Sequence, residues 1–258
     1  MSLGLASPAL AAIMLDMGPT SAITFPANSP AHATGAIPTA ETSWNTIFDT
    51  NRAAGTVLNS DGTTATGVSV VIGQGSAIGV TSFSAPSVAT NLTGSTAATL
   101  GSDYNGTAAQ DGIFKLGAAG GSTTASVGVR IDGLAAGTYT IFGVLRNTNA
   151  SNNTSSEALY VATGAASSTF TFSSLTPAIV GNLQATGNTT WIAGDQYATQ
   201  TVTLAAGESL YVIANGAAGS TESRGMMNAI QIVVPEPGTA AAVLVGLATG
   251  FARRPRRR

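Results

Sequence analysis

The stretch ASVGVRIDGLAAGTYTIFGVL, residues 125–145, shows most clearly how this chain folds. Apolar and polar side chains alternate with a period of two before and after a short connector. The side chains predicted to face inward are Val127, Val129, Ile131, Tyr139, Ile141 and Leu145, while Ser126 and Arg130 face the other way. Such alternation is typical of β-strands that bury one face. The stretch therefore predicts two neighbouring strands, over residues 125–131 and 138–145.

The connector between these strands reads Leu134-Ala135-Ala136-Gly137, and the same four residue types recur at 204–207. Each copy follows one alternating run and precedes another. We expect the leucine to close one end of a sandwich and the glycine to take a positive φ angle in the turn. A hairpin connector used twice explains the recurrence better than a duplicated domain, since the chain has no other repeat.

Alternating runs of the same kind occur along most of the chain. They lie at residues 22–25, 67–72, 78–83, 112–116, 169–172, 201–204, 209–214 and 229–234. About ten short strands at this spacing suit two packed sheets. The predicted fold class is all-β, a two-sheet β-sandwich over residues 20–233.

The composition supports this fold class and argues against one class of partner, nucleic acid. Charged residues make up 9% of the chain, Lys115 is the only lysine, and there are 31 glycines. Long amphipathic helices need more charged and leucine side chains than this. Before residue 235 the chain has five basic and eleven acidic residues, which gives this part a net charge of −6. An acidic body argues against nucleic acid as a partner, because phosphates are bound by basic side chains.

Two residue types that often build functional sites are scarce. There is no cysteine, which excludes disulfides and thiolate metal sites, and His32 is the only histidine. The chain therefore has too few histidines for a multi-histidine metal centre, and only His32 could serve in a catalytic triad. The chain also has no G-x-S-x-G elbow, phosphate-binding loop or H-E-x-x-H sequence.

The C-terminal residues 234–258 read in three parts. A Pro235-Glu236-Pro237 motif precedes an apolar run at 239–252, and the chain ends in Arg253, Arg254, Arg256, Arg257 and Arg258. As a helix, the run would be about 21 Å long, which is short for a hydrocarbon core of about 30 Å unless flanking residues and snorkelling arginines help to span it. The positive charge beyond the run predicts a cytoplasmic C-terminus and an exported body. The alternative is an ordinary C-terminal helix packed on the body.

These three parts, in this order, resemble the PEP-CTERM protein-sorting signal of bacteria. The resemblance covers about a tenth of the chain. It implies a short transmembrane helix that holds the precursor in the inner membrane, and a membrane-bound exosortase as partner. That enzyme would remove the tail, so that the protein reaches the cell surface or the extracellular space. Pro235, Glu236 and Pro237 would form the sorting motif, and the five arginines would stop transfer.

The N-terminal residues 1–19 are predicted to be the remnant of a signal peptide. Residues 3–15 are mostly apolar, and Ala9-Leu10-Ala11 fits the small-x-small pattern of a signal-peptidase site. A basic segment and a full-length apolar segment are missing. The alternative is an irregular leader or a first strand.

The order of features in the body resembles a jelly-roll module that is frequent among PEP-CTERM proteins and related to galactose-binding-like domains. The matching pieces are Ser43-Trp44-Asn45, Asn59-Ser60-Asp61-Gly62 before the run at 67–72, the central residues 131–139, and Met227-Asn228-Ala229-Ile230-Gln231-Ile232. The resemblance implies a fold, and a fold alone does not assign a function.

Carbohydrate binding needs flat aromatic side chains beside polar groups. Trp191, with Asp195 and Tyr197 close by in the sequence, is our candidate for such a surface. Trp44 and Tyr104 are further aromatic candidates, and core packing is the favoured interpretation of Trp44. The polar segment 146–157 is either a binding loop or a solvated turn.

The turns at 59–62 and 103–106 offer oxygen ligands for a structural calcium ion, but each has fewer ligands than a full site needs. We expect no cofactor and no catalytic metal. The first functional hypothesis is a non-enzymatic envelope or matrix protein with a structural or adhesive body. The second is a module that binds extracellular polysaccharide. The third, a polysaccharide lyase or glycosidase, rests on fold analogy alone.

Overall fold

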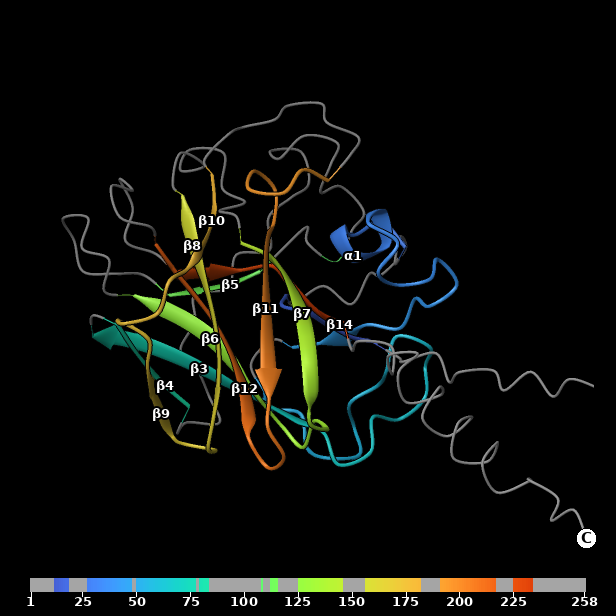
Figure 1. Cartoon of the computed structure of the whole chain (residues 1–258), viewed down its shortest axis with the longest axis horizontal. Helices are drawn as coiled ribbons and strands as arrows, with labels where there is room; N and C mark the ends of the chain where they lie inside the picture. Colours follow the sequence, from blue (N-terminus) through green and yellow to red (C-terminus); the bar gives the residue numbers. More distant parts are fainter. Residues whose placement is uncertain are drawn as a thin grey trace, which may run out of the picture.

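The computed structural model describes residues 12–18, 27–47, 50–77, 79–83, 108, 112–115, 125–145, 156–181, 191–216 and 225–233. This part of the chain is nearly all-β and forms two curled sheets, which are antiparallel except for one strand pair (Figure 1). The predicted all-β class is therefore confirmed.

The first sheet contains both the first and the last described strands. Its order is β11 (Ala198–Leu204), β7 (Gly137–Val144), β14 (Ala229–Val233), β1 (Ile13–Asp16) and β2 (Asn45–Thr46). β1 and β2 are the parallel pair, and every other neighbouring pair in this sheet is antiparallel.

The second sheet has seven strands. Its order is β10 (Ala178–Val180), β8 (Glu157–Gly164), β12 (Ser209–Gly216), β6 (Ser126–Asp132), β3 (Ser69–Ala77), β4 (Val80–Ser82) and β9 (Thr169–Thr171). A register shift between Gln74 and Ala77 interrupts the β3–β4 pair. A separate ribbon joins β13 (Gly225–Met227) to β5 (Ile113–Lys115), and a single helical turn, α1, spans Pro30–Ala33.

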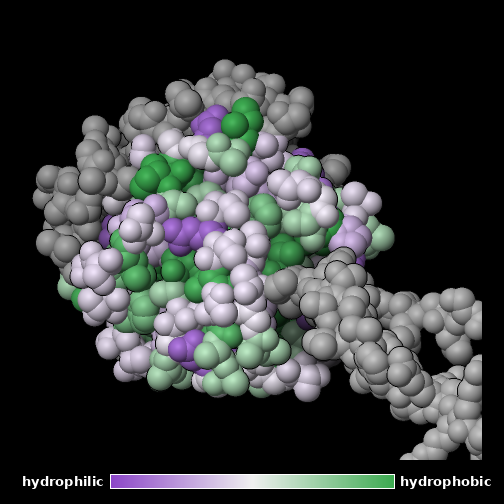
Figure 2. Space-filling view, viewed as in Figure 1, coloured by the Kyte–Doolittle hydropathy of each residue, from purple (hydrophilic) through white to green (hydrophobic). Residues whose placement is uncertain are grey.

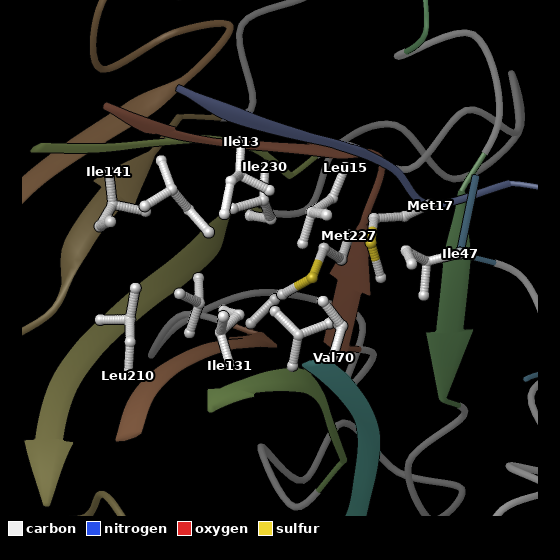
Figure 3. Packing of buried hydrophobic residues seen from close by; sticks show 14 of the residues in the cluster. Ile13, Leu15, Met17, Ile47, Val70, Ile131, Ile141, Leu210, Met227 and Ile230 are labelled. Atoms are coloured by element: carbon white, nitrogen blue, oxygen red, sulfur yellow. The ribbon is translucent and has the colours of Figure 1, made fainter. Parts of the chain in front are cut away.

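The main core lies between the two sheets. Figure 3 shows Ile13, Leu15 and Ile230 on one side pointing toward Val70, Ile131 and Leu210 on the other. The six side chains predicted to face inward from residues 125–145 are all buried in this core. Burial of one such aliphatic or aromatic side chain stabilises a fold by about 1.5–3 kcal/mol.

Each sheet also buries part of its outer face. Residues 27–44, which we term the cover, pack Ala31, Ile37 and Trp44 onto the first sheet in a second apolar cluster. β4 and β9, together with Phe83 and Phe172, form what we term the flap, and they fold back over the second sheet in a third cluster. The molecule thus has one core inside the sandwich and one on each outer face.

The two Leu-Ala-Ala-Gly connectors differ in their backbone. Leu134 and Leu204 are buried at the sandwich end, as predicted. Gly207 has φ 80°, whereas in the first connector the positive φ belongs to Gly133, at 81°. The prediction of a positive φ at Gly137 is wrong because β7 already begins at that residue.

The predicted body boundary at residue 20 is also wrong. Ile13–Asp16 form β1, and the side chains of this strand are buried. Ile13 and Leu15 face the main core, while Met14 belongs to the cluster outside the first sheet. A strand buried on both faces reads as a continuous apolar run, and a short apolar run is also what a leader shows. The run predicted as a strand at 22–25 lies outside the described residues.

Candidate functional site

The predicted carbohydrate-binding residues lie in a compact turn that leads into β11. Within it, Asp195 N and Gln196 N donate to the carbonyl oxygen of Ile192, at 3.3 and 2.9 Å. The Gln196 side chain returns to accept from Ile192 N at 2.6 Å. Gly194 has φ 81° and accepts from Gly181 N at 2.7 Å, so the turn is tied to the residue that follows β10.

Tyr197 does not present a ring to solvent. Its exposed fraction is 5%, and its ring centroid lies 5.9 Å from that of Phe142 on β7. Ala198 faces the main core, so its neighbour Tyr197 faces the outside of the first sheet, where the cover buries it. Asp195 is 8% exposed. The predicted surface that combines Trp191, Tyr197 and Asp195 is therefore wrong for the last two residues.

Trp191 is half-buried and packs against the cluster outside the first sheet. Its indole Nε1 donates to Asn28 Oδ1 in the cover, at 2.9 Å. Next to it, Ile192 is 43% exposed, and Ile179 on β10 is 44% exposed. These two are the exposed large hydrophobic residues of the described chain. Trp191 and Ile192 are neighbours in the sequence, and we term these two residues the apolar patch.

The other aromatic candidates are also placed. Trp44 is 8% exposed in the outer cluster, which confirms its predicted core role. Tyr104 lies outside the described residues, as do most of the segment 146–157 and the turn at 103–106. Of that segment, Glu157 is buried at the start of β8.

In the turn at 59–62, a carboxylate oxygen of Asp61 accepts hydrogen bonds from the neighbouring Thr63. Asp61 Oδ1 accepts from Thr63 N at 2.9 Å and from Thr63 Oγ1 at 2.6 Å. These bonds to the Thr63 side chain and backbone hold the pKa of Asp61 below its ordinary value. The described residues contain no group of three or more His, Cys, Asp or Glu side chains that could hold a metal ion.

A buried polar network around His32 was not predicted. Gln231 Nε2 donates to Ser29 Oγ at 2.7 Å, and Ser29 Oγ lies 2.6 Å from His32 Nδ1. Because Glu41 O can only accept, His32 Nε2 donates to it at 2.8 Å, and in the neutral imidazole Nδ1 then accepts from the Ser29 hydroxyl. Gln231 Oε1 also accepts from Ala31 N at 3.0 Å. The network fastens the cover to β14.

A second unpredicted group lies under the flap. The ring of Phe170 stacks on that of Tyr211 with centroids 4.1 Å apart, and Phe83 meets the same ring edge-on at 5.5 Å. The Tyr211 hydroxyl donates to Ala165 O at 2.7 Å and accepts from Ser167 N at 2.9 Å. Arg130 pairs with Asp132 and donates to Ser167 O at 2.6 Å. No sequence motif marks this group, because its members come from four separate segments.

The sorting motif Pro235, Glu236 and Pro237 and the five terminal arginines lie outside the described residues. The strand predicted over residues 229–234 is confirmed as β14, which ends at Val233. Within the described ranges, no helix has the length and apolar character needed to cross a membrane.

Comparison with known proteins gives little similarity. No family model matches the chain, and no curated protein matches it. Among solved structures, it is similar to part of a Paenibacillus xanthan lyase, with TM-score 0.31 and 16% identity over 64% of this chain. It is also similar to part of the Arthrobacter globiformis T6 isomalto-dextranase complexed with panose, with TM-score 0.25 and 14% identity over 48% of this chain. The chain spans 13% and 19% of those two proteins. At these TM-scores, neither similarity assigns a fold family or a function.

Proposed function

We propose that this protein is an exported bacterial envelope or extracellular-matrix protein, with a structural or adhesive jelly-roll body and a C-terminal tail that an exosortase removes. The observation that supports this proposal most is the position at which the last described strand ends. β14 pairs with β7 on one side and β1 on the other, and it ends at Val233, two residues before Pro235. The packed sheet is thus complete just where the sorting motif begins.

In this proposal, the tail acts after the body has been exported. Pro235 and Pro237 lack backbone donors and disfavour pairing with the sheet, so that Glu236 stays accessible to the processing enzyme. The apolar run at 239–252 inserts in the inner membrane, and the five arginines keep the end of the chain on the cytoplasmic side.

The surface of the first sheet suits a structural or adhesive role. The exposed side chains on β11 and β7 include Thr138, Thr199, Thr201 and Thr203, and Thr138 lies directly opposite Thr203. Figure 2 shows pale and apolar residues over most of this face, with few strongly hydrophilic ones. We propose no catalytic activity and no cofactor for the body.

The N-terminal leader remains part of the proposal in a shorter form. Ala12 is 2% exposed, and its carbonyl oxygen accepts from Ser60 N at 2.7 Å. A signal-peptidase cut after Ala11 would leave Ala12 and the whole of β1 in the mature protein. A cut a few residues later would remove a central strand.

Intact-mass analysis of the protein from its native host tests the sorting function. We expect a mature protein that lacks residues 239–258 and lies at the cell surface or outside the cell. Replacing Glu236 by Ala and the five arginines by Ser should leave the tail uncut and the protein in the inner membrane. A cytoplasmic protein that retains Arg258 would contradict the proposal.

Binding of extracellular polysaccharide is the second candidate function, and the half-exposed ring of Trp191 beside Ile192 favours it. Retention on insoluble polysaccharide should be lost in Trp191→Ala and largely kept in Trp191→Phe, which preserves a ring. The melting temperature of both variants must be measured as well. If Trp191→Ala binds normally, or fails only because it unfolds, this function is ruled out for Trp191.

A further inference from the structure

The first and last strands of the body place both of its ends on one side. β1 and β14 are antiparallel neighbours, and Ile13 lies opposite Ile232. The chain therefore enters β1 and leaves β14 at the same end of the first sheet. Ala12, the residue before β1, is next to Val233, the last residue of β14, in this register.

Two turns project at this same end. Thr140 on β7 is paired with Val233, so Gly137, three residues earlier on β7, lies about 10 Å beyond Val233. Leu204 is paired with Gly137, so the β11–β12 turn is there too. The exposed residues of the two turns are small and uncharged: Ala135, Ala136, Ala205 and Ala206. We term this the turn end.

The apolar patch lies at the opposite end of the sandwich. β11 runs from Ala198 to Leu204 toward the turn end, so Trp191 and Ile192, which precede Ala198, lie at the far end (Figure 1). The eight residues of β7 separate the two ends by about 26 Å at 3.3 Å per residue.

The connection to the apolar run is short in comparison. Residues 234–238 connect Val233 to Thr239 in six Cα–Cα steps, which span at most about 21 Å when fully extended. With the strands upright on the membrane, the turn end, which projects about 10 Å past Val233, therefore lies no more than about 11 Å above the lipid surface. We propose that the membrane-held precursor stands with its turn end on the lipid headgroups and its apolar patch facing outward. This inference rests on the proposed sorting function.

The chemistry of the turn end permits this close approach. Ala135, Ala136, Ala205 and Ala206 carry no charge whose hydration would be lost near the membrane. Glu208, the acidic residue of the second turn, accepts from Ala205 N through Oε2 at 2.9 Å. Asp132 is paired with Arg130. Trp191 and Ile192 are then directed away from the membrane, toward whatever the anchored precursor meets outside the cell.

The absence of cysteine from the chain allows a direct test. The full chain carrying Ala206→Cys, or as a second variant Ala136→Cys, is labelled with nitrobenzoxadiazole and reconstituted into vesicles of phosphatidylethanolamine and phosphatidylglycerol. Ala193→Cys, exposed in the turn after Trp191, is the matched control at the far end. Circular dichroism confirms that each variant is folded.

A headgroup-attached quencher in the vesicles should reduce the fluorescence of the label at 206 and at 136 several-fold more than that of the label at 193. Equal quenching at both ends, or stronger quenching at 193, in chains that float with the vesicles would overturn the orientation and leave the sorting function standing. Chains that do not float with vesicles would overturn both.

Discussion

The two layers that protect the outer faces of the sandwich are held in different ways. The cover over the first sheet is fixed by directed hydrogen bonds, in which Gln231 reaches both Ser29 and Ala31. The flap over the second sheet is joined to β3 by backbone pairing through β4, and its side chains are held by ring contacts around Tyr211. Hydrogen bonds specify one position and cost a desolvation penalty when broken, whereas stacked rings supply area and tolerate small shifts. The cover should therefore be sensitive to loss of polar atoms, and the flap to loss of volume.

The largest effect is expected from Tyr211→Ala. It removes a fully buried ring that Phe83 and Phe170 contact, so the free energy of unfolding should fall by about 3–5 kcal/mol. Tyr211→Phe keeps the ring and leaves Ala165 O and Ser167 N without their partner, at a cost of about 1–3 kcal/mol. Urea denaturation followed by circular dichroism measures both. If the phenylalanine variant lost as much as the alanine variant, the flap would depend on polar bonds like the cover.

Gln231→Leu tests the cover. The substitution has nearly the same volume but leaves Ala31 N without an acceptor and Ser29 Oγ without a donor, so we expect a loss of about 2–3 kcal/mol. Gln200→Leu is the matched control in the same sheet, since its one bond, to Thr176 O, is at the surface and should contribute less than about 1 kcal/mol. Equal losses in the two variants would show that the network around His32 does not hold the cover.

Gly73→Ala should loosen the flap by overfilling the contact between the flap and β3. A Cβ at Gly73 would lie 2.4 Å from Cδ1 of Phe83, so the ring must move, at a cost of about 1–3 kcal/mol. Gly164→Ala, where a Cβ would meet no atom within 4 Å, should leave the melting temperature nearly unchanged. Faster hydrogen exchange confined to β4 and β9 in Gly73→Ala would confirm that the flap opens by itself. Unchanged exchange and melting would contradict this.

The smallest expected effect is a fall in melting temperature at alkaline pH, to which one tyrosine of the main core and one beside the flap contribute. Burial raises the pKa of Tyr139 in the main core and of Tyr160 beside the flap above the ordinary 10.0. The neutral form is favoured in the folded state, so this stability is fully present below pH 10 and is lost as the pH rises through the higher folded values. Melting temperatures should therefore fall above about pH 10, and Tyr139→Phe and Tyr160→Phe should each reduce the fall. If the melting temperatures of both variants fell with rising pH as steeply as that of the original protein, groups other than these two tyrosines would cause the fall.

Local alternation predicted β6 and β7, because Val127, Val129 and their counterparts, which face the main core, alternate with polar or small residues. β12 and β14 were predicted as well, although the described structure buries them on both faces. β1 was missed because Ile13, Met14 and Leu15 are buried on both faces and resemble a leader. β8 has the same difficulty, since Leu159 faces the main core and Tyr160 the flap.

The candidate site was predicted less well than the fold, because burial of an aromatic residue depends on distant parts of the chain. Trp44 was correctly placed in a core from its apolar neighbours. Tyr197 has polar neighbours, and it is buried by the cover, whose Asn28 lies 163 residues from Trp191. A contact between residues so far apart in the sequence cannot be predicted from a local sequence pattern.

The pairing of β1 with β14 has a consequence for the order in which the molecule folds. Met14 and Gln231, which touch across this pair, are 217 residues apart in the sequence. Contacts of such separation close long loops and make folding slow. β1 can pair with β2 early in synthesis, but β14, its neighbour on the other side, becomes available only after residues 229–233 have been made. Chaperones that hold nascent chains would be most needed at Ile13, Met14 and Leu15, whose apolar side chains are made long before β14 is there to help bury them.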